Sequence, residues 1–541
     1  MKLTREGIRK KDDWTVAGIA LPSYDVQAVA KRTEEAPVWL HFGIGNIFRA
    51  FIGGIADQLL REGSMDRGIL CAEAFDYEVV DKIYRPHDNL VLSVILHADG
   101  SRDCRVLGSL AGAVKADAKE EKQWERLKEI FRNPGLSMVS FTITEKGYAL
   151  KNPDGELYGF VKADLENGPD EASGAMAIVA AMLLERYRNG KAPLALVSMD
   201  NVSRNGEKLQ DSVLFMAEGW IRRGFADEGF LAYLTDEKKI TFPWTMIDRI
   251  TPRPGEDVYR ELSGKGVEDM EILVTDKKTY IAPFTNTESP SYLVIEDSFP
   301  NGRPPLEKAG VYMTSRETVN KSERMKVTAC LNPIHTALCT YDIMLGYDLF
   351  ADGMQDPELK KLAEILGYQE GLPVVEDPGI LSPKAFLDEL MSERFPNVYL
   401  GDTSARIAVD ISQMTAIRFG ETIKAYVRRD KSAAFLTAIP LAIAGWIRYL
   451  LAVDDEGNPF ELSPDPMIPY MKEQLSGLRF GEPDSLKDQL RGVLSNESLF
   501  GSDLYEAGLG GKIETMVRSE LEGAGAVRRT LRSWLSGKDP V

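Results

Sequence analysis

The sequence predicts an α/β protein in which an N-terminal domain with a mostly parallel sheet precedes a mainly α-helical C-terminal domain. Between residues 38 and 199, short apolar runs followed by turns and helical patterns recur, which is typical of β-α-β units. From about residue 314 onward the apolar spacing is mostly helical. The turn-rich stretch Asn301-Gly-Arg-Pro-Pro305 separates the two patterns, so we expect domains at 1–312 and 313–541.

Length and composition exclude several classes of protein. With 541 residues the chain is too long for one ordinary core, and its net charge of −18 argues against nucleic acid and anionic membranes as partners. The four cysteines lack metal-site spacing and there are only four histidines, so we expect no bound metal, reduced thiols and a cytoplasmic location. The longest apolar run, Ala433 to Trp446, is too short to span a bilayer and predicts a buried helix.

The first β-α unit contains a glycine turn. The apolar run Val38–Phe42 leads through this turn into an apolar-periodic stretch that ends near Leu60. Strand, glycine turn and helix are the start of a Rossmann-type fold, in which glycines let main-chain N–H groups approach a pyrophosphate. The third glycine of the usual fingerprint is replaced by Phe48, so an ordinary turn is the alternative. The predicted cofactor-binding residues of the turn are Gly43, Gly45, Asn46, Ile47, Phe48 and Arg49.

Acidic side chains end the second predicted strand, Gly68–Phe75. Asp76, with Glu73 as the second choice, could hold the ribose diol of a dinucleotide, although either could simply be solvated. An acid at this position disfavours a 2′-phosphate, so the expected cofactor is NAD.

Two later strands add polar residues at the same edge of the sheet. Leu136–Thr144 and Leu194–Met199 are strongly apolar, and the helix Gly174–Arg188 lies between them. Because open parallel sheets bind ligands at the carboxyl ends of their strands, we expect functional residues there. The candidates are Thr144 and Glu145 for the cofactor, and Asn201, which could equally be a turn residue.

The remaining strand signals are a hairpin and two separate strands. Leu90–His97 and Cys104–Leu110 flank a glycine turn and predict the hairpin. Met270–Thr275 and Tyr292–Glu296 predict the two further strands.

The densest group of chemically active side chains lies between Lys326 and His335. Burial lowers the pKa of a lysine toward the working pH, which makes Lys326 a candidate acid/base. Asn332 offers a neutral donor to a developing oxyanion, and His335 adds a group that can orient a substrate. Glu323 lies one turn before the lysine, on the same helix face. The alternative is a surface lysine followed by a capped helix start at Asn332-Pro333.

Six segments between about residues 38 and 425 resemble the mannitol dehydrogenase family of polyol-specific long-chain dehydrogenases. They are HFGIGNIFRAF near the start, TITEKGY at 142–148, SMDN…NG at 198–206, FPWTMIDRITP at 242–252, YLVIEDSFPNGRPP at 292–305 and the Lys326–His335 segment. The resemblance implies a Rossmann-type N-terminal domain, a helical C-terminal domain and metal-independent hydride transfer. From the helical pattern itself we expect the second domain to pack over the carboxyl edge of the sheet.

The resemblance also assigns roles residue by residue. The implied catalytic residues are Lys326 as general acid/base, Asn201 and Asn332 as donors to the carbonyl oxygen, and Glu323 as a proton relay. The implied substrate-binding residues are His335, Asp248 and Arg406.

Three positions depart from the family pattern. Five residues separate Lys326 from Asn332, where family members such as mannitol dehydrogenase have four. On one continuous helix the extra residue would rotate Lys326 by about 100°. We expect Asn332 to cap a new helix with Pro333 in its first turn, so that the join absorbs the residue. Met414 stands where the family usually has a lysine, and Ile247 where it has valine.

Two segments favour a hexuronate reductase within the family. Arg418–Thr422 and the CLNPIHT form of the catalytic segment look more like those enzymes than like mannitol dehydrogenase. We therefore expect NAD-dependent interconversion of a keto-uronate and its aldonate, with D-fructuronate and D-mannonate as the first choice. The alternatives are tagaturonate reduction, mannitol-type polyol oxidation, a non-catalytic sugar- or nucleotide-binding regulator, and a transferase on the same fold. By analogy with the family we expect a monomer or a small homo-oligomer.

Overall fold

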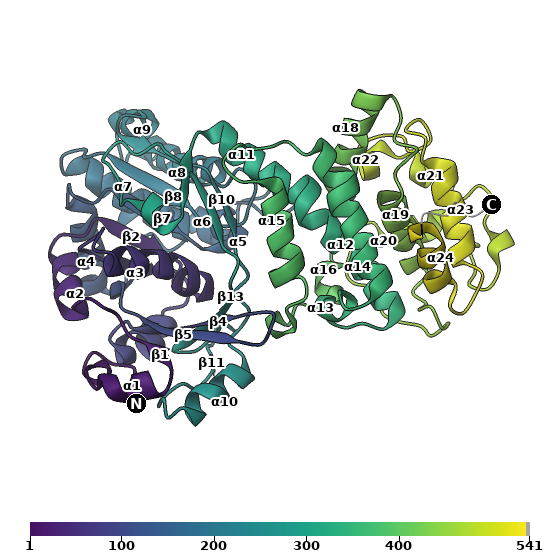
Figure 1. Ribbon diagram of the computed structural model, residues 1–541. Helices are drawn as coiled ribbons and strands as arrows, with labels where there is room; N and C mark the ends of the chain where they lie inside the picture. The colour runs from purple at the N-terminus through teal and green to yellow at the C-terminus, as the bar shows by residue number, and fades with distance from the viewer. Residues whose placement is uncertain (537–541) are drawn as a thin grey trace. The chain divides into compact units, whose positions relative to one another are not determined.

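The computed structural model describes residues 1–536 and divides the chain into two compact units, Met1–Val319 and Asn320–Val541. The first unit contains the sheets and the helices that cover them (Figure 1). The second unit is built from helices. The predicted fold class, α/β followed by a mainly helical part, is confirmed.

A six-stranded parallel sheet forms the centre of the N-terminal unit. Its spatial order is β6 (Leu110–Lys115), β3 (Ile69–Glu73), β2 (Trp39–Phe42), β7 (Met138–Phe141), β8 (Leu194–Ser198) and β9 (Ile240–Thr241). Counted along the chain, this is the order third, second, first, fourth, fifth, sixth, which is that of dinucleotide-binding folds. The order reverses between β2 and β7, so ligands of such a sheet bind beyond the carboxyl ends of these two strands.

Both faces of this sheet are covered, which explains why its strands are apolar throughout. Leu40 and Phe42 of β2 enter one core together with residues of α4 and α7. Their neighbour Trp39 enters a second core together with Leu59 of α3. Alternation along each strand therefore divides its side chains between two cores, one on each face.

Three smaller sheets complete the unit. They are the mixed sheet β1 (Ile19–Ala20), β5 (Arg102–Leu107), β4 (Val91–Leu96) and β13 (Phe284–Glu288); the sheet β10 (Thr245–Asp248), β14 (Tyr292–Glu296) and β15 (Tyr312–Thr314); and the pair β11 (Leu273–Val274) and β12 (Tyr280–Ile281). The predicted hairpin is confirmed by the antiparallel pairing of β4 with β5. The predicted strand Met270–Thr275 shrinks to the two residues of β11.

The helices of the N-terminal unit mostly connect the strands. They are α1 (Lys11–Val16), α2 (Val26–Glu35), α3 (Gly53–Arg61), α4 (Glu121–Arg132), α5 (Thr144–Tyr148), α6 (Gly159–Asn167), α7 (Ala175–Arg188), α8 (Asn205–Arg222), α9 (Glu228–Thr235) and α10 (Glu256–Gly264). Short π-helical turns, η2 (Phe48–Ile52) and η3 (Val80–Tyr84), follow β2 and β3.

The C-terminal unit contains no strand between residues 320 and 536. The helix α11 (Arg316–Met325) leads into it, and its other helices are α12 (Asn332–Leu345), α13 (Phe350–Gly353), α14 (Pro357–Glu364), α15 (Pro383–Glu389), α16 (Ser404–Ile407), α17 (Thr415–Arg418), α18 (Gly420–Asp430), α19 (Ala438–Tyr449), α20 (Ile468–Gln474), α21 (Leu490–Leu494), α22 (Glu497–Phe500), α23 (Gly510–Glu520) and α24 (Ala526–Leu535). Every residue of α19 is buried, which confirms a buried helix, although the helix begins at Ala438 and Phe435 of the predicted run is 55% exposed. Within residues 1–536, no helix combines the length and the apolar character needed to cross a membrane.

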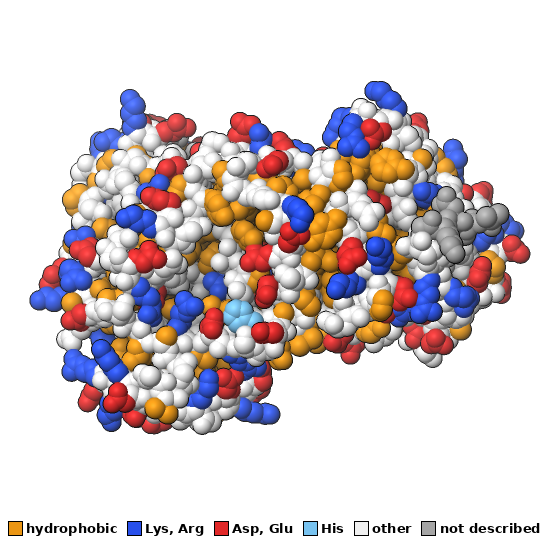
Figure 2. Space-filling view, in the orientation of Figure 1, with side chains coloured by type: hydrophobic (Ala, Val, Ile, Leu, Met, Phe, Trp, Pro, Cys, Tyr) orange, Lys and Arg blue, Asp and Glu red, His pale blue; other side chains and the backbone are white. Residues whose placement is uncertain are grey.

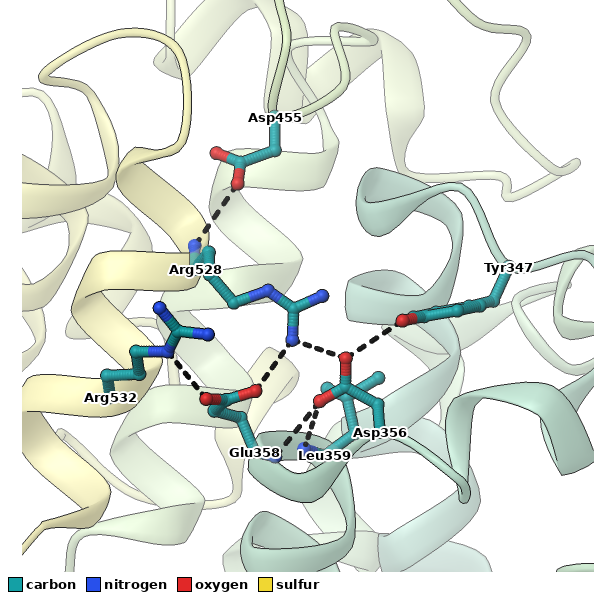
Figure 3. Close-up of polar contacts among 7 residues, drawn as sticks. All are labelled: Tyr347, Asp356, Glu358, Leu359, Asp455, Arg528 and Arg532. Carbon is teal, nitrogen blue, oxygen red and sulfur yellow. Dashed lines mark hydrogen bonds and ion pairs between the residues drawn. The ribbon is translucent and has the colours of Figure 1, made fainter.

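A polar network joins the start of α14 to α24 (Figure 3). Asp356 caps α14 by accepting a 2.9 Å hydrogen bond from the main-chain N–H of Glu358, and it accepts another of 2.9 Å from the Tyr347 hydroxyl. Arg528 of α24 contacts both carboxylates, and Arg532 donates to Glu358 at 2.6 Å. Burial alone would raise the pKa of Asp356, but these donors lower it below its usual value. The network therefore fixes the last helix to a segment that precedes it by about 170 residues.

The charges on the surface and the state of the cysteines agree with what the composition predicts. Acidic and basic side chains are interspersed on the face shown in Figure 2. All four cysteines are free and buried, and burial raises the pKa of each thiol above its ordinary value.

Candidate active site

The turn after β2 has the geometry of a site for a phosphate backbone. Gly43 adopts φ +86°, and a β-carbon there would lie 2.1 Å from the carbonyl oxygen of Thr142, so only glycine fits. A β-carbon at Gly45 would point into open space, which leaves this side of the turn free for a ligand to approach. The two glycines therefore have different roles, one set by the neighbouring strand and the other compatible with a bound group.

The side chains that follow these glycines point into the protein. Phe48 is fully buried and stacks on His41 with ring centroids 3.9 Å apart. Arg49 is also fully buried and donates to the main-chain carbonyl of Ala282 at 2.6 Å and to Asn46 Oδ1 at 2.8 Å. A ligand at this turn would therefore meet the main chain of these residues, while their side chains shape the turn from behind.

The two acids at the end of β3 differ in what their oxygens contact. Glu73 accepts hydrogen bonds from the main-chain N–H groups of Ile44 at 3.2 Å, Phe75 at 2.9 Å and Asp76 at 3.1 Å. Burial raises the pKa of Glu73, and these donors partly oppose the shift. The Oδ2 atom of Asp76 accepts a hydrogen bond of 2.6 Å from the Thr275 hydroxyl. Its buried Oδ1 atom has no hydrogen-bond partner within residues 1–536. Asp76 thus retains an acceptor for a ligand hydroxyl, and Glu73 holds the glycine turn in place.

An aspartate that the sequence analysis did not select organises the next part of the edge. The predicted strand Leu136–Thr144 ends at Phe141, and Thr144 takes φ +62° where α5 begins. Asp200, beyond β8, accepts from the N–H groups of Ile143 and Thr144 at 2.9 Å each and from the Tyr148 hydroxyl at 2.6 Å. A β-branched residue with positive φ is rare and strained, and such strain clusters at functional sites. The signal available in the sequence was an acid directly after an apolar strand.

The other predicted residues of the N-terminal unit have different surroundings. Glu145 is exposed, and its side chain forms an ion pair with Lys208 at the surface. Asn201 is exposed in the turn after β8. Asp248 is buried at the last position of β10.

In the C-terminal unit, a π-helical turn lies at the predicted catalytic lysine. The helix α11 ends at Met325, and Lys326–Cys330 forms the π-turn η7 before α12 begins at Asn332. The N–H of Leu331 donates to the carbonyl of Lys326 at 3.1 Å, five residues back instead of four. The Lys326 side chain is 3% exposed. A π-turn is the usual way in which a helix accommodates one extra residue, and such turns are frequent at functional sites.

The expectation that Asn332 caps a new helix is wrong. Leu331 occupies the cap position with helical dihedral angles, and no side chain caps α12. The chain therefore passes from α11 to α12 without leaving a helical conformation, and the π-turn accommodates the extra residue. Pro333 lies in the first turn of α12, where a missing N–H costs nothing. The Asn332 Oδ1 atom is buried and has no hydrogen-bond partner within residues 1–536.

His335 of α12 is a neutral imidazole among cations. Its ring lies edge-on to Phe350, with centroids 4.6 Å apart, and tilted against Phe395 at 5.1 Å. Burial, followed by the charges of three arginines, lowers its pKa to about 3. The arginines are Arg394, Arg418 and Arg406. An anionic ligand at this point would offset the mutual repulsion of these charges.

The three arginines are not equivalent. Arg406 is exposed, and its Nε donates to Asp402 at 3.0 Å, so the predicted substrate-facing arginine has a carboxylate partner. Arg418, which the sequence analysis did not assign to the substrate, donates to Thr336 Oγ1 at 2.5 Å and to the sulfur of Met414 at 2.8 Å. Its buried Nε has no hydrogen-bond partner within residues 1–536. A guanidinium thus lies beside Met414, the position where the resemblance leads one to expect a lysine.

These observations fit a dinucleotide in the N-terminal unit and an anionic substrate in the C-terminal unit. The forced glycine conformation, the open side of Gly45 and the unpaired oxygen of Asp76 match a pyrophosphate and a ribose diol. The neutral His335 and the arginines around it match a substrate that carries both hydroxyl groups and a carboxylate. Among residues 1–536, no group of three or more His, Cys, Asp or Glu side chains is arranged to bind a metal ion.

Comparisons with known proteins give matches along most of the chain. The family model of the mannitol dehydrogenase Rossmann domain matches residues 38–308, and that of the mannitol dehydrogenase C-terminal domain matches residues 318–519. A D-mannonate oxidoreductase of Thermotoga maritima is 50% identical over 542 residues, which cover 100% of both chains.

Two solved structures have a similar fold. A D-sorbitol dehydrogenase in substrate-free form aligns with a TM-score of 0.78 at 26% identity, covering 95% of this chain and 98% of that one. Mannitol 2-dehydrogenase of Pseudomonas fluorescens, in a ternary complex with NAD and D-mannitol, aligns with a TM-score of 0.69 at 23% identity, covering 99% of this chain and 100% of that one.

Proposed function

Because this chain belongs to the mannitol dehydrogenase family, we propose that it is an NAD-dependent oxidoreductase that interconverts D-fructuronate and D-mannonate. The observation that carries this proposal is the full-length relative at 50% identity, a D-mannonate oxidoreductase. The cations around His335 support a carboxylate-bearing substrate independently, because a neutral polyol would not need them. We place the enzyme in the cytoplasm as a monomer or small homo-oligomer, with a small sugar acid as its substrate and neither nucleic acid nor membrane as a partner.

In the proposed mechanism, reduced NAD, when bound at the Gly43–Arg49 turn, would supply the hydride for the ketone carbon of the substrate. Lys326 gives a proton to the carbonyl oxygen, and Glu323 connects the lysine to water. Asn201 and Asn332 donate hydrogen bonds to that oxygen as negative charge develops on it. In the oxidative direction Lys326 takes the proton from the hydroxyl group of the aldonate, and the oxidised cofactor would accept the hydride from the same carbon.

Other residues bind and orient the substrate. Asp248 and the neutral His335 hold hydroxyl groups, and Arg406 holds the carboxylate together with Arg418. We include Arg418 because its unpaired Nε offers a donor that Arg406, already bonded to Asp402, provides less readily. On the cofactor side, Asp76 accepts from the ribose hydroxyls and the main chain of the Gly43–Arg49 turn meets the pyrophosphate. Thr144 and the main chain of Glu145 lie beside the cofactor at the neighbouring strand end.

The proposal is tested by following NADH oxidation with a panel of keto-uronates and ketoses. We expect kcat/KM to be clearly higher for fructuronate or tagaturonate than for fructose. Arg418→Ala and Arg406→Ala should each reduce turnover of the uronate more than any residual turnover of fructose, with Arg418→Ala the more severe. Equal efficiency on fructose, or an equal loss on both substrates in both variants, would favour polyol oxidation instead, the activity named for the similar D-sorbitol dehydrogenase.

A further inference from the structure

A cavity of about 250 Å³ lies within the N-terminal unit, where three groups of elements meet. Its walls come from η2 and α3, from the hairpin β4–β5, and from the segments around β10, β14 and β15. Its lining includes none of the residues assigned above to the cofactor or the substrate. The cavity thus shares no residue with the proposed cofactor and substrate sites.

The charged side chains that line this cavity are both arginines. Arg105 of β5 and Arg249, directly after β10, contribute guanidinium groups, and no aspartate or glutamate is among the described residues of the lining. This is unusual in a chain with 83 acidic and 65 basic residues. Serine hydroxyls at positions 93, 289 and 291 line it as well. Ser93 pairs directly with Arg105 across β4 and β5, so the two side chains share one face.

Neither arginine has a carboxylate partner. The Arg105 side chain forms no hydrogen bond or ion pair within residues 1–536, although it is exposed. Arg249 uses Nε and Nη2 to donate to Thr287 Oγ1 at 2.9 Å and to the main-chain carbonyl of Glu288 at 2.9 Å, and it lies over the ring of Phe51 at 5.3 Å. Its Nη1 makes no hydrogen bond within the described residues. Protein contacts thus fix the plane of Arg249 and leave one edge of the guanidinium for another acceptor.

The two cations also influence each other. Burial lowers the pKa of Arg249 to about 10, Glu288 opposes this shift, and the charge of Arg105 adds to it. The Glu288 carboxylate accepts from the main-chain N–H of Ile250 at 2.5 Å and lies outside the cavity lining. Asp103, two residues before Arg105, pairs with His97 and also lies outside the lining. The described lining therefore contains two positive charges and no carboxylate, and the charge of Glu288 acts on Arg249 from outside the lining.

We propose that this cavity binds a small oxyanion, the phosphate or carboxylate group of a metabolite, between Arg105 and Arg249. Planar guanidinium groups bind such oxyanions through paired hydrogen bonds, and serine hydroxyls complete their coordination. The volume suits a single small acid or phosphate, since drug-sized ligands occupy roughly 300–1,000 Å³. The strong negative charge of the chain opposes an anion only at long range, because salt screens it beyond about 8–10 Å. Since Arg249 directly follows Asp248, an anion bound to Arg249 would also stabilise the end of β10.

The test is calorimetric titration of the full-length protein with inorganic phosphate and, separately, with malonate. Ionic strength is held constant, and NAD is present at saturation so that the glycine turn is filled. We expect saturable binding of at least one anion, weakened by about tenfold or more in Arg105→Ala, less in Arg105→Lys, and unchanged in Arg222→Ala, an exposed arginine outside the cavity. Arg249→Lys should also weaken binding, because lysine keeps the positive charge but lacks the paired N–H donors of a guanidinium group.

Each outcome decides the proposal. Binding of phosphate alone identifies a phosphorylated ligand, and binding of malonate alone identifies a carboxylic acid; both support the site if they depend on Arg105. If neither phosphate nor malonate binds, the proposal is overturned. Binding that Arg105→Ala leaves unchanged overturns it as well, because the anion then occupies another site.

Discussion

Removing one residue from the π-turn η7 tests the register of the proposed catalytic side chains. If this turn absorbs the residue added between Lys326 and Asn332, deletion of Val327 should convert η7 into an ordinary α-helical turn. Both side chains would then keep their relative orientation, and four residues would separate them, as in mannitol dehydrogenase. Val327 is only half-buried, so its removal costs little packing.

The magnitude follows from helix geometry. One residue that is not absorbed rotates everything beyond it by about 100° and shifts it by about 1.5 Å. At the surface of a helix about 11 Å across, this rotation displaces a side chain by roughly 8 Å. Misplacement by even 1 Å can cost about 10²-fold in rate, so an unabsorbed residue should abolish turnover.

The assay compares two variants that change the same segment by one residue in opposite directions. The deletion variant should keep kcat within about tenfold of the wild-type value, whereas insertion of one alanine after Val327 should lower it by more than about 10³-fold. NADH binding, followed by fluorescence, and circular dichroism should be unchanged in both. A folded deletion variant that loses activity as completely as the insertion variant would refute the reasoning, and so would an active insertion variant.

Three further predictions concern single side chains. Asp76→Ser should relax the preference for NADH over NADPH in kcat/KM, and if only Glu73→Ser does so, the ranking of the two acids is reversed. Lys326→Ala should lower turnover by roughly 10²–10⁴-fold with a smaller effect on cofactor binding; retained turnover would place the acid/base elsewhere, with Lys321 the nearest other lysine. Burial raises the pKa of Glu520 from 4.5 to about 8, against the hydrogen bond from Tyr341, so the folded state keeps a proton that the unfolded state loses. The free energy of unfolding should therefore fall as pH rises from 4.5 to 8, by up to roughly 4–5 kcal/mol, and urea titrations of Glu520→Gln should lack this slope.

Local patterns in the sequence were sufficient for much of the fold. The strand before Gly43 and the strand Tyr292–Glu296 were predicted almost to the residue, because apolar runs bounded by turn residues depend on local chemistry. The strand Leu136–Thr144 was predicted too long, because a carboxylate from Asp200, far along the chain, holds Thr144 in a left-handed conformation. Contacts of that range have no signature in a local pattern.

In the candidate site, too, local patterns predicted some features and missed those that depend on contacts between distant segments. Comparison with the family pattern revealed one extra residue between Lys326 and Asn332. A capped helix and a π-turn are both compatible with that spacing, and the predicted cap was wrong. Arg418 was missed because its proposed role depends on its position near His335, which lies on another helix, α12. The choice of Asp76 over Glu73 rested on position, and the unpaired Oδ1 gives it a physical reason.

The burial of all four cysteines makes this chain convenient for spectroscopy. Thiols react as thiolates, and inaccessible groups with raised pKa values react slowly with maleimides. A single cysteine placed at an exposed position in each unit, such as Glu62 and Glu497, should therefore take up dyes without removal of the native thiols. Energy transfer between the two dyes would then report, molecule by molecule, whether the distance between the units changes when cofactor and substrate are added.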